Sequence, residues 1–300
     1  MTFSSDIVTL LKPRITLNVV LTAAGGLFLA PVSVEPLKKW LLLIGMVLIV
    51  GGANALNMYI EREIDGRATR TRNRPLPAGR MQPRVALTLG LLMGLAALPV
   101  LALGVNLLTG ILGVVSLVLY VMVYTPMKQH SPGALVVGAI PGAMPPLMGW
   151  TAATGHLELH GLVLFAIMFL WQLPHFLAIT LYRTSDYQNA GYKVTVTEHG
   201  LLTAKVQIVL YLAALVPVSL MLVPLGIGGP VYLWTALVGG AVFFGVGVAG
   251  MRRAAGNRWA RLLFTVSLLY LSLLMVGLLV GQALNGPEDA AALLSVLRLI

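Results

Sequence analysis

Apolar stretches of membrane-spanning length recur along the chain, with short polar breaks between them. A stretch of roughly 20 apolar residues is long enough to cross a bilayer as a helix. Nine such stretches occur, at residues 14–31, 40–60, 86–104, 107–125, 133–154, 162–182, 204–224, 230–250 and 262–284. Because they are continuous rather than alternating, a membrane β-barrel is disfavoured. The pattern predicts an all-α, polytopic membrane bundle of about nine transmembrane helices.

The same pattern indicates how the chain is organised. Most of the 300 residues fall in predicted spans, so we expect a single transmembrane domain over residues 1–300. A cut near residue 130 gives two four-helix units and a last helix. In each unit the second span runs into a charged segment, near 61–85 and 183–203. The sequence therefore predicts two pseudo-repeats, an arrangement common in membrane proteins.

Charge agrees with a membrane location. Charged residues make up 10% of the chain, against about 25% in a soluble domain. The net charge of +10 would indicate a nucleic-acid partner in a soluble protein, but Lys and Arg also accumulate on the cytoplasmic side of membrane proteins. With the N-terminus in the cytoplasm, only Lys38, Lys39 and Arg298 of the 20 basic residues fall outside. We expect no nucleic-acid partner, a cytoplasmic N-terminus and an outer C-terminus.

The cysteine, proline and glycine residues limit the chemistry and the helix shapes that the chain can have. The chain has no cysteine, which excludes disulfides, thiolate nucleophiles and thiolate metal sites. Glycines and prolines are dense between Gly138 and Gly149, which predicts that the fifth span is broken into a bent element. Pro174 predicts a kink in the sixth span. An organellar leader is not evident at the N-terminus.

A first polar constellation follows the second span. Asn57, Glu61 and Asp65 are four residues apart, so they form one stripe on a helix, with neighbouring positions about 6 Å apart. Two carboxylates and an amide on one face suit a magnesium ion that is also bound by substrate phosphates. The alternative is a helix end whose acids only pair with nearby arginines such as Arg62.

The loop after this stripe is rich in arginine. Seven arginines and no lysine lie between residues 62 and 84. Arginine makes bidentate contacts with phosphate oxygens, which lysine cannot make. Acids followed at once by arginines predict a site for a magnesium-bound diphosphate. Membrane topology or lipid headgroup contact is the alternative explanation for any single arginine.

A second polar constellation surrounds the end of the sixth span. Trp171, Gln172, His175 and Phe176 would line a cavity with flat surfaces and one titratable group. A histidine satisfied by packing is the alternative. Further along, the sequence offers a second acid and two more cations for a phosphate at the cytoplasmic mouth, namely Asp186, Arg183 and Lys193.

These motifs resemble the intramembrane prenyltransferase superfamily of the UbiA type. The stripe N-x-x-x-E-x-x-x-D followed by R-x-x-x-R-P matches its first signature, where aspartate is more usual than Glu61. The resemblance implies that the acids hold Mg²⁺ on an isoprenoid diphosphate, and that Arg70 and Arg74 hold the diphosphate. It implies Asn57, Glu61, Asp65 and Asp186 as catalytic magnesium ligands, with Arg183 and Lys193 completing the phosphate clamp.

Three further motifs are similar to the haem-farnesylating branch of that superfamily. They are L-x-K-P-R-x-T at Leu10–Thr16, W-Q-x-P-H-F at Trp171–Phe176 and D-Y-x-x-A-G from Asp186. Where the superfamily usually has a second aspartate, this chain has Ala190. The resemblance implies transfer of farnesyl from farnesyl diphosphate to a vinyl group of haem B, with water addition giving haem O.

The resemblance also implies the setting of that reaction. Haem B is then a substrate and Mg²⁺ the cofactor, in a multi-pass protein of the bacterial inner membrane. Trp171, Gln172, His175 and Phe176 would bind the acceptor, with His175 a hypothetical contact to the iron or a propionate. A downstream haem A-forming enzyme is a candidate partner.

Two other functions stay open at this point. One is a prenyltransferase for another aromatic acceptor, such as a quinone precursor, although W-Q-x-P-H-F and Ala190 argue against it. The other is a cation-coupled transporter, which would explain intramembrane acids and bent helices. A transporter should carry polar groups near the bilayer midplane, whereas the acids and arginines here gather at the predicted cytoplasmic ends of the spans.

Overall fold

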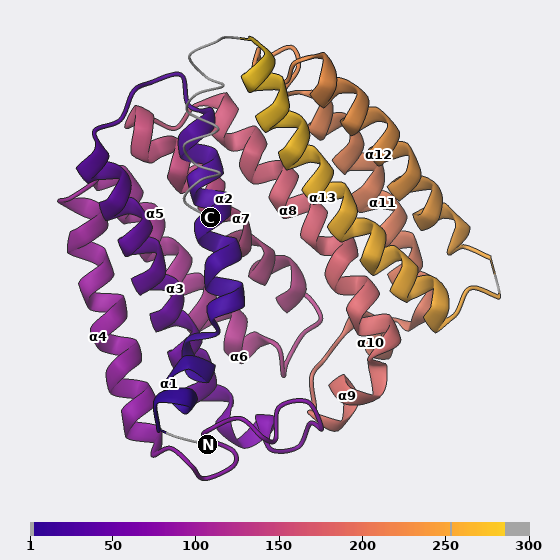
Figure 1. The fold of residues 1–300 in the computed structure, drawn as a ribbon. Coiled ribbons are helices and arrows are strands. Elements are labelled where there is room, and N and C mark those ends of the chain that lie inside the picture. The colour runs from indigo at the N-terminus through magenta and orange to yellow at the C-terminus, as the bar shows by residue number, and fades with distance from the viewer. Residues whose placement is uncertain (1–2, 253, 286–300) are drawn as a thin grey trace. The chain divides into compact units, whose positions relative to one another are not determined.

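The computed structural model describes residues 3–252 and 254–285, and every regular element in these ranges is a helix (Figure 1). The helices are α1 (Phe3–Leu11), α2 (Pro13–Leu29), α3 (Pro36–Asp65), α4 (Pro83–Ala102), α5 (Leu107–Val118), the π-helix η1 (Leu119–Tyr124), α6 (Thr125–Met127), α7 (Ala134–Thr154), α8 (Leu159–Tyr182), α9 (Thr184–Asn189), α10 (Thr195–Glu198), α11 (Gly200–Leu220), α12 (Pro230–Ala249) and α13 (Asn257–Asn285).

The predicted all-α membrane architecture is confirmed. Among the described residues, eight helices are long and apolar enough to cross a membrane, and the pair α1 and α2, bent by 40°, gives a ninth. The elements α5, η1 and α6 together form one of the eight, Leu107–Met127. The pseudo-repeats, the single domain and the orientation of the termini stay predictions. Arg298 and the predicted outer C-terminus lie outside the described residues.

Local sequence explains where several spans begin. Helices α2, α3, α4 and α12 each have proline in the first turn, where the missing N–H is not needed and the fixed φ favours the helix. Helix α5 begins instead with Asn106, whose side chain accepts a hydrogen bond from the Thr109 backbone N–H. These signals fix the helix starts more sharply than the apolar pattern alone.

The chain forms two compact units. Unit 1 comprises residues 1–165 and 183–200, and unit 2 comprises residues 166–182 and 201–300, in each case as far as they are described. The boundary falls inside α8, so the residues after Tyr182 return to unit 1. At one end of unit 1, the loop after α3 runs between α1 and α9 (Figure 1).

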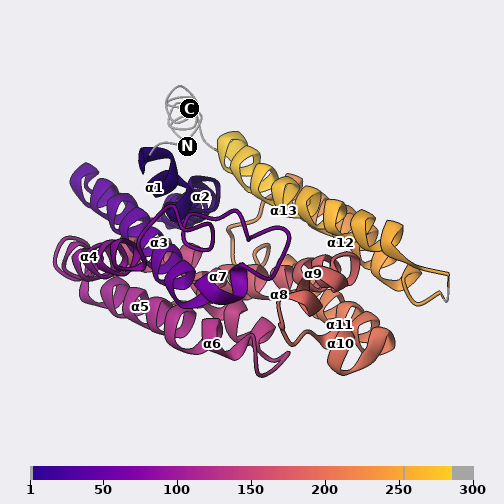
Figure 2. The ribbon, with the colours of Figure 1, turned by 90° about the horizontal axis from the view of Figure 1, so that it is seen from below.

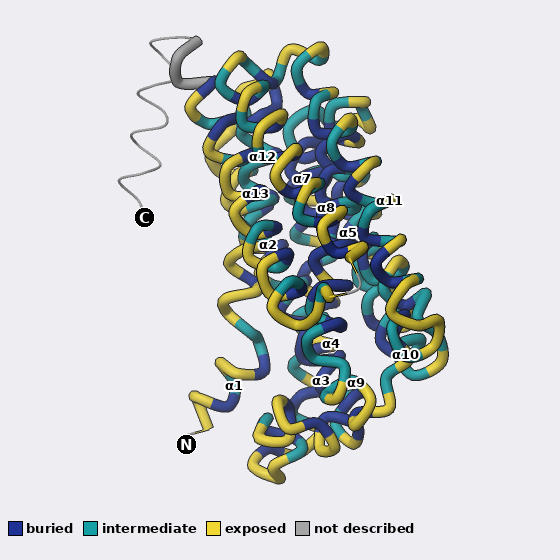
Figure 3. Tube along the Cα trace, turned by 90° about the vertical axis from the view of Figure 1, so that its right-hand side faces the viewer, coloured by how far each residue is buried: buried dark blue, intermediate teal, exposed yellow. Residues whose placement is uncertain are grey.

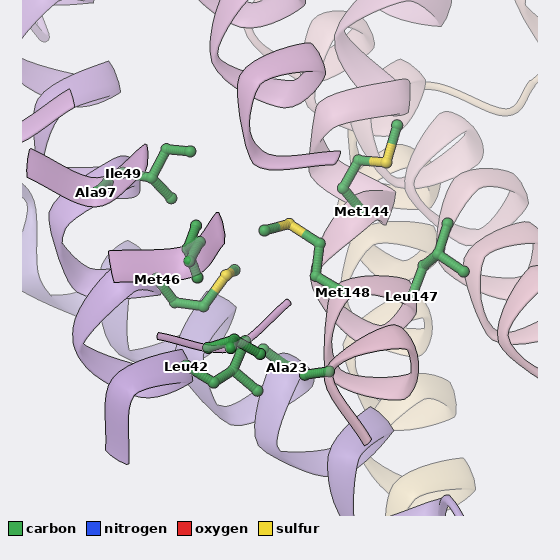
Figure 4. Close-up of a cluster of buried hydrophobic side chains, with 11 residues drawn as sticks. Ala23, Leu42, Met46, Ile49, Ala97, Met144, Leu147 and Met148 are labelled. Atoms are coloured by element: carbon green, nitrogen blue, oxygen red, sulfur yellow. The ribbon is translucent and has the colours of Figure 1, made fainter. Parts of the chain in front are cut away.

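The core of unit 1 is built by α2, α3, α4 and α7. Ala23, Met46, Ala97 and Met148 are buried in one apolar cluster (Figure 4). Helices α2 and α7 approach closely, because a Cβ on Gly149 would overlap the Ala23 carbonyl. Small residues permit such backbone contact between membrane helices.

The predicted break in the fifth span is wrong. Helix α7 runs unbroken through Pro141, Pro145 and Pro146. Proline removes one backbone donor but keeps a helical φ, and a packed neighbour can retain the helix across it. The backbone break lies instead between α1 and α2, at Lys12.

Unit 2 packs α11, α12 and α13 along their lengths. Helices α12 and α13 lie side by side (Figures 1 and 2), and Gly247 of α12 leaves room for Leu212 of α11. Exposed and buried positions alternate along α12 and α13 (Figure 3), as expected for helices with one face toward lipid. Buried polar groups are paired: Tyr232 donates to the Ser219 carbonyl and Tyr270 to the Ser219 hydroxyl, both at 2.7 Å.

Candidate active site

Three polar side chains form a buried stripe near the C-terminal end of α3. Asn57, Glu61 and Asp65 are 2%, 3% and 2% exposed. Their spacing of four residues places them on one helical face, as the sequence predicts. Burying two carboxylates is costly unless each is paired, so their partners define what this end of α3 can do.

Asp65, the last residue of α3, is paired with the loop that follows the helix. Arg74 Nη1 lies 2.6 Å from Asp65 Oδ2, and the Thr71 hydroxyl donates to the Asp65 carbonyl at 2.7 Å. The loop after α3 therefore folds back over the helix end and carries Arg74 to the stripe. Arg70, which lies on the same loop, is exposed. Arg62, the partner that the alternative interpretation suggested, bonds to Glu63 instead.

Glu61 is paired with a remote part of unit 1. Lys128 Nζ lies 2.7 Å from Glu61 Oε1, and both side chains are largely buried. The Tyr192 side chain also lies beside Glu61. Burial, together with the nearby carboxylates of Glu61 and Asp65, raises the pKa of Tyr192, so this phenol stays protonated. Neither partner belongs to the predicted diphosphate site, although Lys128 is the only Lys or Arg of its loop.

Asn57 is oriented by a hydroxyl on the neighbouring span. Asn57 Nδ2 donates to Thr125 Oγ1 at 3.2 Å, and Thr125 Oγ1 donates to the Tyr120 carbonyl at 2.8 Å. Because the single hydroxyl proton is used on Tyr120, Thr125 can only accept from Asn57. The amide oxygen is left to Lys12, whose Nζ donates to Asn57 Oδ1 at 3.3 Å.

Two backbone irregularities bring these partners to the stripe. The π-helix η1 ends just before Thr125, and π-helical turns are frequent at functional sites. Lys12 has φ 49°, in the left-handed region that L-residues other than Asn and Asp seldom occupy. This conformation forms the bend between α1 and α2.

The segment after α8 packs against the same end of α3. Ala190 and Tyr192 contact Ile64 and Ala68, and the Lys193 N–H donates to the Lys128 carbonyl at 2.9 Å. This explains the alanine at position 190, since its side chain is buried against α3. Unit 1 thus brings the second charged segment beside the end of α3 that carries the acid stripe.

The charged residues of that segment pair locally. Asp186 lies 3.6 Å from Arg183 and Lys193 lies 3.2 Å from Glu198. Within the described ranges, no three His, Cys, Asp or Glu side chains gather closely enough to hold a metal by themselves. Asp186 therefore does not join Glu61 and Asp65 in such a group.

The aromatic motif lies in unit 2 and forms its own arrangement. The His175 ring stacks on Trp171, with centroids 4.9 Å apart, and lies 4.7 Å from Phe264. His175 Nδ1 is 2.7 Å from the Ser267 hydroxyl, and Trp171 Nε1 donates to the Ser267 carbonyl at 2.7 Å. Phe176 meets the His175 ring edge-on. Gln172 donates to the Met168 carbonyl within α8.

The bundle and the paired acids describe a polytopic membrane protein with a charged site at the end of one span. The chain belongs to the UbiA prenyltransferase family, whose model matches residues 19–285. This match removes the transporter alternative, because the family is one of prenyltransferases.

Relatives narrow the class further. The chain is 53% identical over 279 residues to a protein of Anaeromyxobacter sp. (strain Fw109-5), covering 93% of this chain and 94% of the relative. It is 48% identical over 277 residues to a protein of Myxococcus xanthus (strain DK1622), covering 92% and 94%. Both relatives are named protoheme IX farnesyltransferase.

Solved structures share the fold at low sequence identity. One, on digeranylgeranylglyceryl phosphate synthase in membranes, has a TM-score of 0.80 at 15% identity and covers 92% of this chain and 97% of its own. Another, a UbiA homolog from Archaeoglobus fulgidus bound to GPP and Mg²⁺, has a TM-score of 0.63 at 14% identity, with coverage of 91% and 99%. These likenesses establish the UbiA fold for this chain.

Proposed function

We propose that this prenyltransferase moves a farnesyl group from farnesyl diphosphate to a vinyl group of haem B, with addition of water, to give haem O. What carries the proposal is the identity of about half, over more than nine-tenths of the chain, to proteins named protoheme IX farnesyltransferase. The buried acid stripe supports the donor half of the reaction, and the aromatic motif supports the acceptor half.

The residues of the stripe fit a magnesium ion. Asn57, Glu61 and Asp65 offer only oxygen donors, which Mg²⁺ prefers, and this ion usually takes one or two carboxylates together with substrate phosphates and water. Bound magnesium would supply Lewis-acid neutralisation of the diphosphate. Asp186 is the fourth proposed ligand.

The cations at this end of unit 1 would bind the diphosphate. We assign this role to Arg70, Arg74, Arg183 and Lys193, and add Lys128 because it already reaches the stripe. When the bond from farnesyl C1 to oxygen breaks, its electron pair leaves with the diphosphate. Preorganised cations stabilise that developing charge at little reorganisation cost. The apolar side chains of the spans would keep the allylic cation from water.

The acceptor step uses the aromatic motif of unit 2. Trp171, Phe176 and Gln172 would hold the flat macrocycle, with His175 toward its iron. The electron pair of the vinyl double bond forms the new carbon–carbon bond to farnesyl C1. The cation left beside the ring takes the oxygen of water, and the second proton of that water is released to solvent. Haem B is thus a substrate rather than a resident cofactor.

The direct test is product mass. Purified protein is incubated with haem B, farnesyl diphosphate and Mg²⁺, and haem O is the expected product. Asp65→Asn, which keeps side-chain volume but removes the charge, should abolish formation of haem O and release of diphosphate. Product from 4-hydroxybenzoate but not from haem B would overturn the acceptor and leave a prenyltransferase of another aromatic ring. If haem O forms, a downstream haem A-forming enzyme is the expected consumer.

A further inference from the structure

Ser267, on α13, lies next to Nδ1 of the His175 ring. It is fully buried, and its hydroxyl has two neighbours in unit 2. The first is His175 Nδ1 at 2.7 Å. The second is the carbonyl of Phe264, to which Ser267 Oγ donates at 2.6 Å. No feature of the sequence marked Ser267, because it lies 92 residues from His175 in an apolar span.

Counting protons decides the tautomer of His175. A carbonyl oxygen can only accept, and a serine hydroxyl has one proton to give. At 2.6 Å the Phe264 carbonyl takes that proton. Ser267 Oγ must then accept from the imidazole, so the proton of neutral His175 is on Nδ1. Nε2 is left with its electron pair.

The ring is also held against rotation. It stacks on the indole of Trp171, and the ring of Phe264 lies tilted against it. Trp171 is itself anchored, because its Nε1 donates to the backbone carbonyl of Ser267. A flipped ring would place a carbon against the Ser267 hydroxyl and lose a buried hydrogen bond, which is unfavourable. The direction of Nε2 is therefore set by the surrounding packing.

We propose that Ser267 is a positioning residue that holds His175 in the Nδ1–H tautomer, so that Nε2 donates its electron pair to the iron of the haem acceptor. This rests on the proposed function, which makes haem the acceptor. A histidine that binds a metal usually gives its other ring N–H to a fixed acceptor, which sets the tautomer and raises the basicity of the ligating nitrogen. Here Ser267 is that acceptor.

The tautomer can be tested without substrate. Protein labelled with ¹⁵N at its five histidines is compared by NMR with His175→Ala, which assigns the His175 signals. Wild type should show a protonated Nδ1 and an unprotonated Nε2. Ser267→Ala should shift His175 toward the other tautomer, and Ser267→Thr should retain the wild-type pattern. A wild-type signal with the proton on Nε2 would overturn the proposal.

The second experiment measures whether binding depends on the haem iron. Ser267→Ala should weaken binding of ferric haem about 10–100-fold, the usual effect of removing such a partner, and His175→Ala should weaken it at least as much. Both variants should bind metal-free protoporphyrin IX as wild type does, because that ring has no iron to ligate. Ser219→Ala is the matched control, a fully buried serine of the same unit that contacts Tyr270 rather than His175.

The outcomes separate this proposal from the proposed function. If wild type makes haem O but Ser267→Ala keeps the same tautomer and haem affinity, the role of Ser267 fails and the function stands. If the expected tautomer and iron-dependent binding are found but no haem O forms, the function fails and the iron contact stands. Equal loss of haem and metal-free porphyrin in Ser267→Ala contradicts iron ligation and indicates a distorted pocket.

Discussion

Replacing Thr125 with valine tests whether the orientation of Asn57 matters for the magnesium site. Valine has nearly the same shape as threonine but cannot accept the hydrogen bond from Asn57 Nδ2. The Tyr120 carbonyl loses the side-chain donor but keeps the backbone N–H of residue 125. The substitution therefore acts almost entirely on the amide of Asn57.

The expected cost to the fold is small. A buried donor left without an acceptor costs about 1–3 kcal/mol, while hydrogen bonds between membrane helices average about 0.6 kcal/mol. We expect Thr125→Val to lower the free energy of unfolding by about 1 kcal/mol, which leaves the protein folded. The effect on the site is larger, because a freed amide can turn its NH₂ group toward the carboxylates and present no oxygen. By analogy with other residues that orient metal ligands, Mg²⁺ affinity should fall about 10–100-fold.

Calorimetry gives the measurement. Binding of inorganic diphosphate is titrated at several Mg²⁺ concentrations, alongside the Mg²⁺ dependence of turnover. Thr125→Ser keeps the hydroxyl and should behave as wild type. Thr109→Val is the matched control, since Thr109 is buried and bonds to Thr151 at the other end of the same span, about 24 Å away along the helix. If Thr125→Val loses stability as Thr109→Val does but keeps its Mg²⁺ dependence, Asn57 is not a magnesium ligand oriented by Thr125.

Two further predictions follow from buried cations. Lys128→Met should destabilise the protein by about 3–5 kcal/mol, because Glu61 is left as an unpaired buried charge. In thermal unfolding, the double variant Glu61→Gln/Lys128→Met should recover most of that lost stability. The double variant should nevertheless bind diphosphate poorly. Recovery of Mg²⁺-dependent turnover in the double variant would count against both assigned roles. Lys205 is buried and donates to the carbonyls of Arg252 and Ala255 at 3.2 Å, so it should stabilise the fold without taking part in the reaction. Lys205→Met should lower the unfolding temperature and leave the turnover rate per folded molecule unchanged. A changed affinity for magnesium or haem would contradict this prediction.

Features encoded locally could be predicted from the sequence. Span existence follows from apolar length, so the predicted stretch 133–154 matches α7 to within a residue at its start. The acid stripe follows from helical spacing, and the structure shows that all three of its residues are also buried. The prolines of α7 misled the prediction because their effect depends on neighbouring helices rather than on the local sequence.

Partners from distant segments could not be predicted. Lys128 lies 67 residues from Glu61, and Thr125 lies 68 residues from Asn57. Neither belongs to the motifs around the acids, and each arrives at the stripe only because α5, η1 and α6 pack beside α3 in unit 1. The only signal available was Lys128 itself, a lone basic residue at the end of an otherwise apolar span. Buried carboxylates demand such cations, so their presence was predictable even where their identity was not.

Glu61 and Asp65 differ in how far along the chain their partners lie. Aspartate is more usual at this position in the superfamily that the sequence resembles, and glutamate adds one methylene to the side chain. In the structure Asp65 is satisfied by Arg74, only nine residues away, whereas Glu61 reaches out to Lys128 and Tyr192. The longer side chain thus joins α3 to the segment after α6 and to the segment after α9. Glu61 is the residue of the stripe that departs from the usual aspartate of the superfamily. It is also the residue that connects the first charged segment to the second within unit 1.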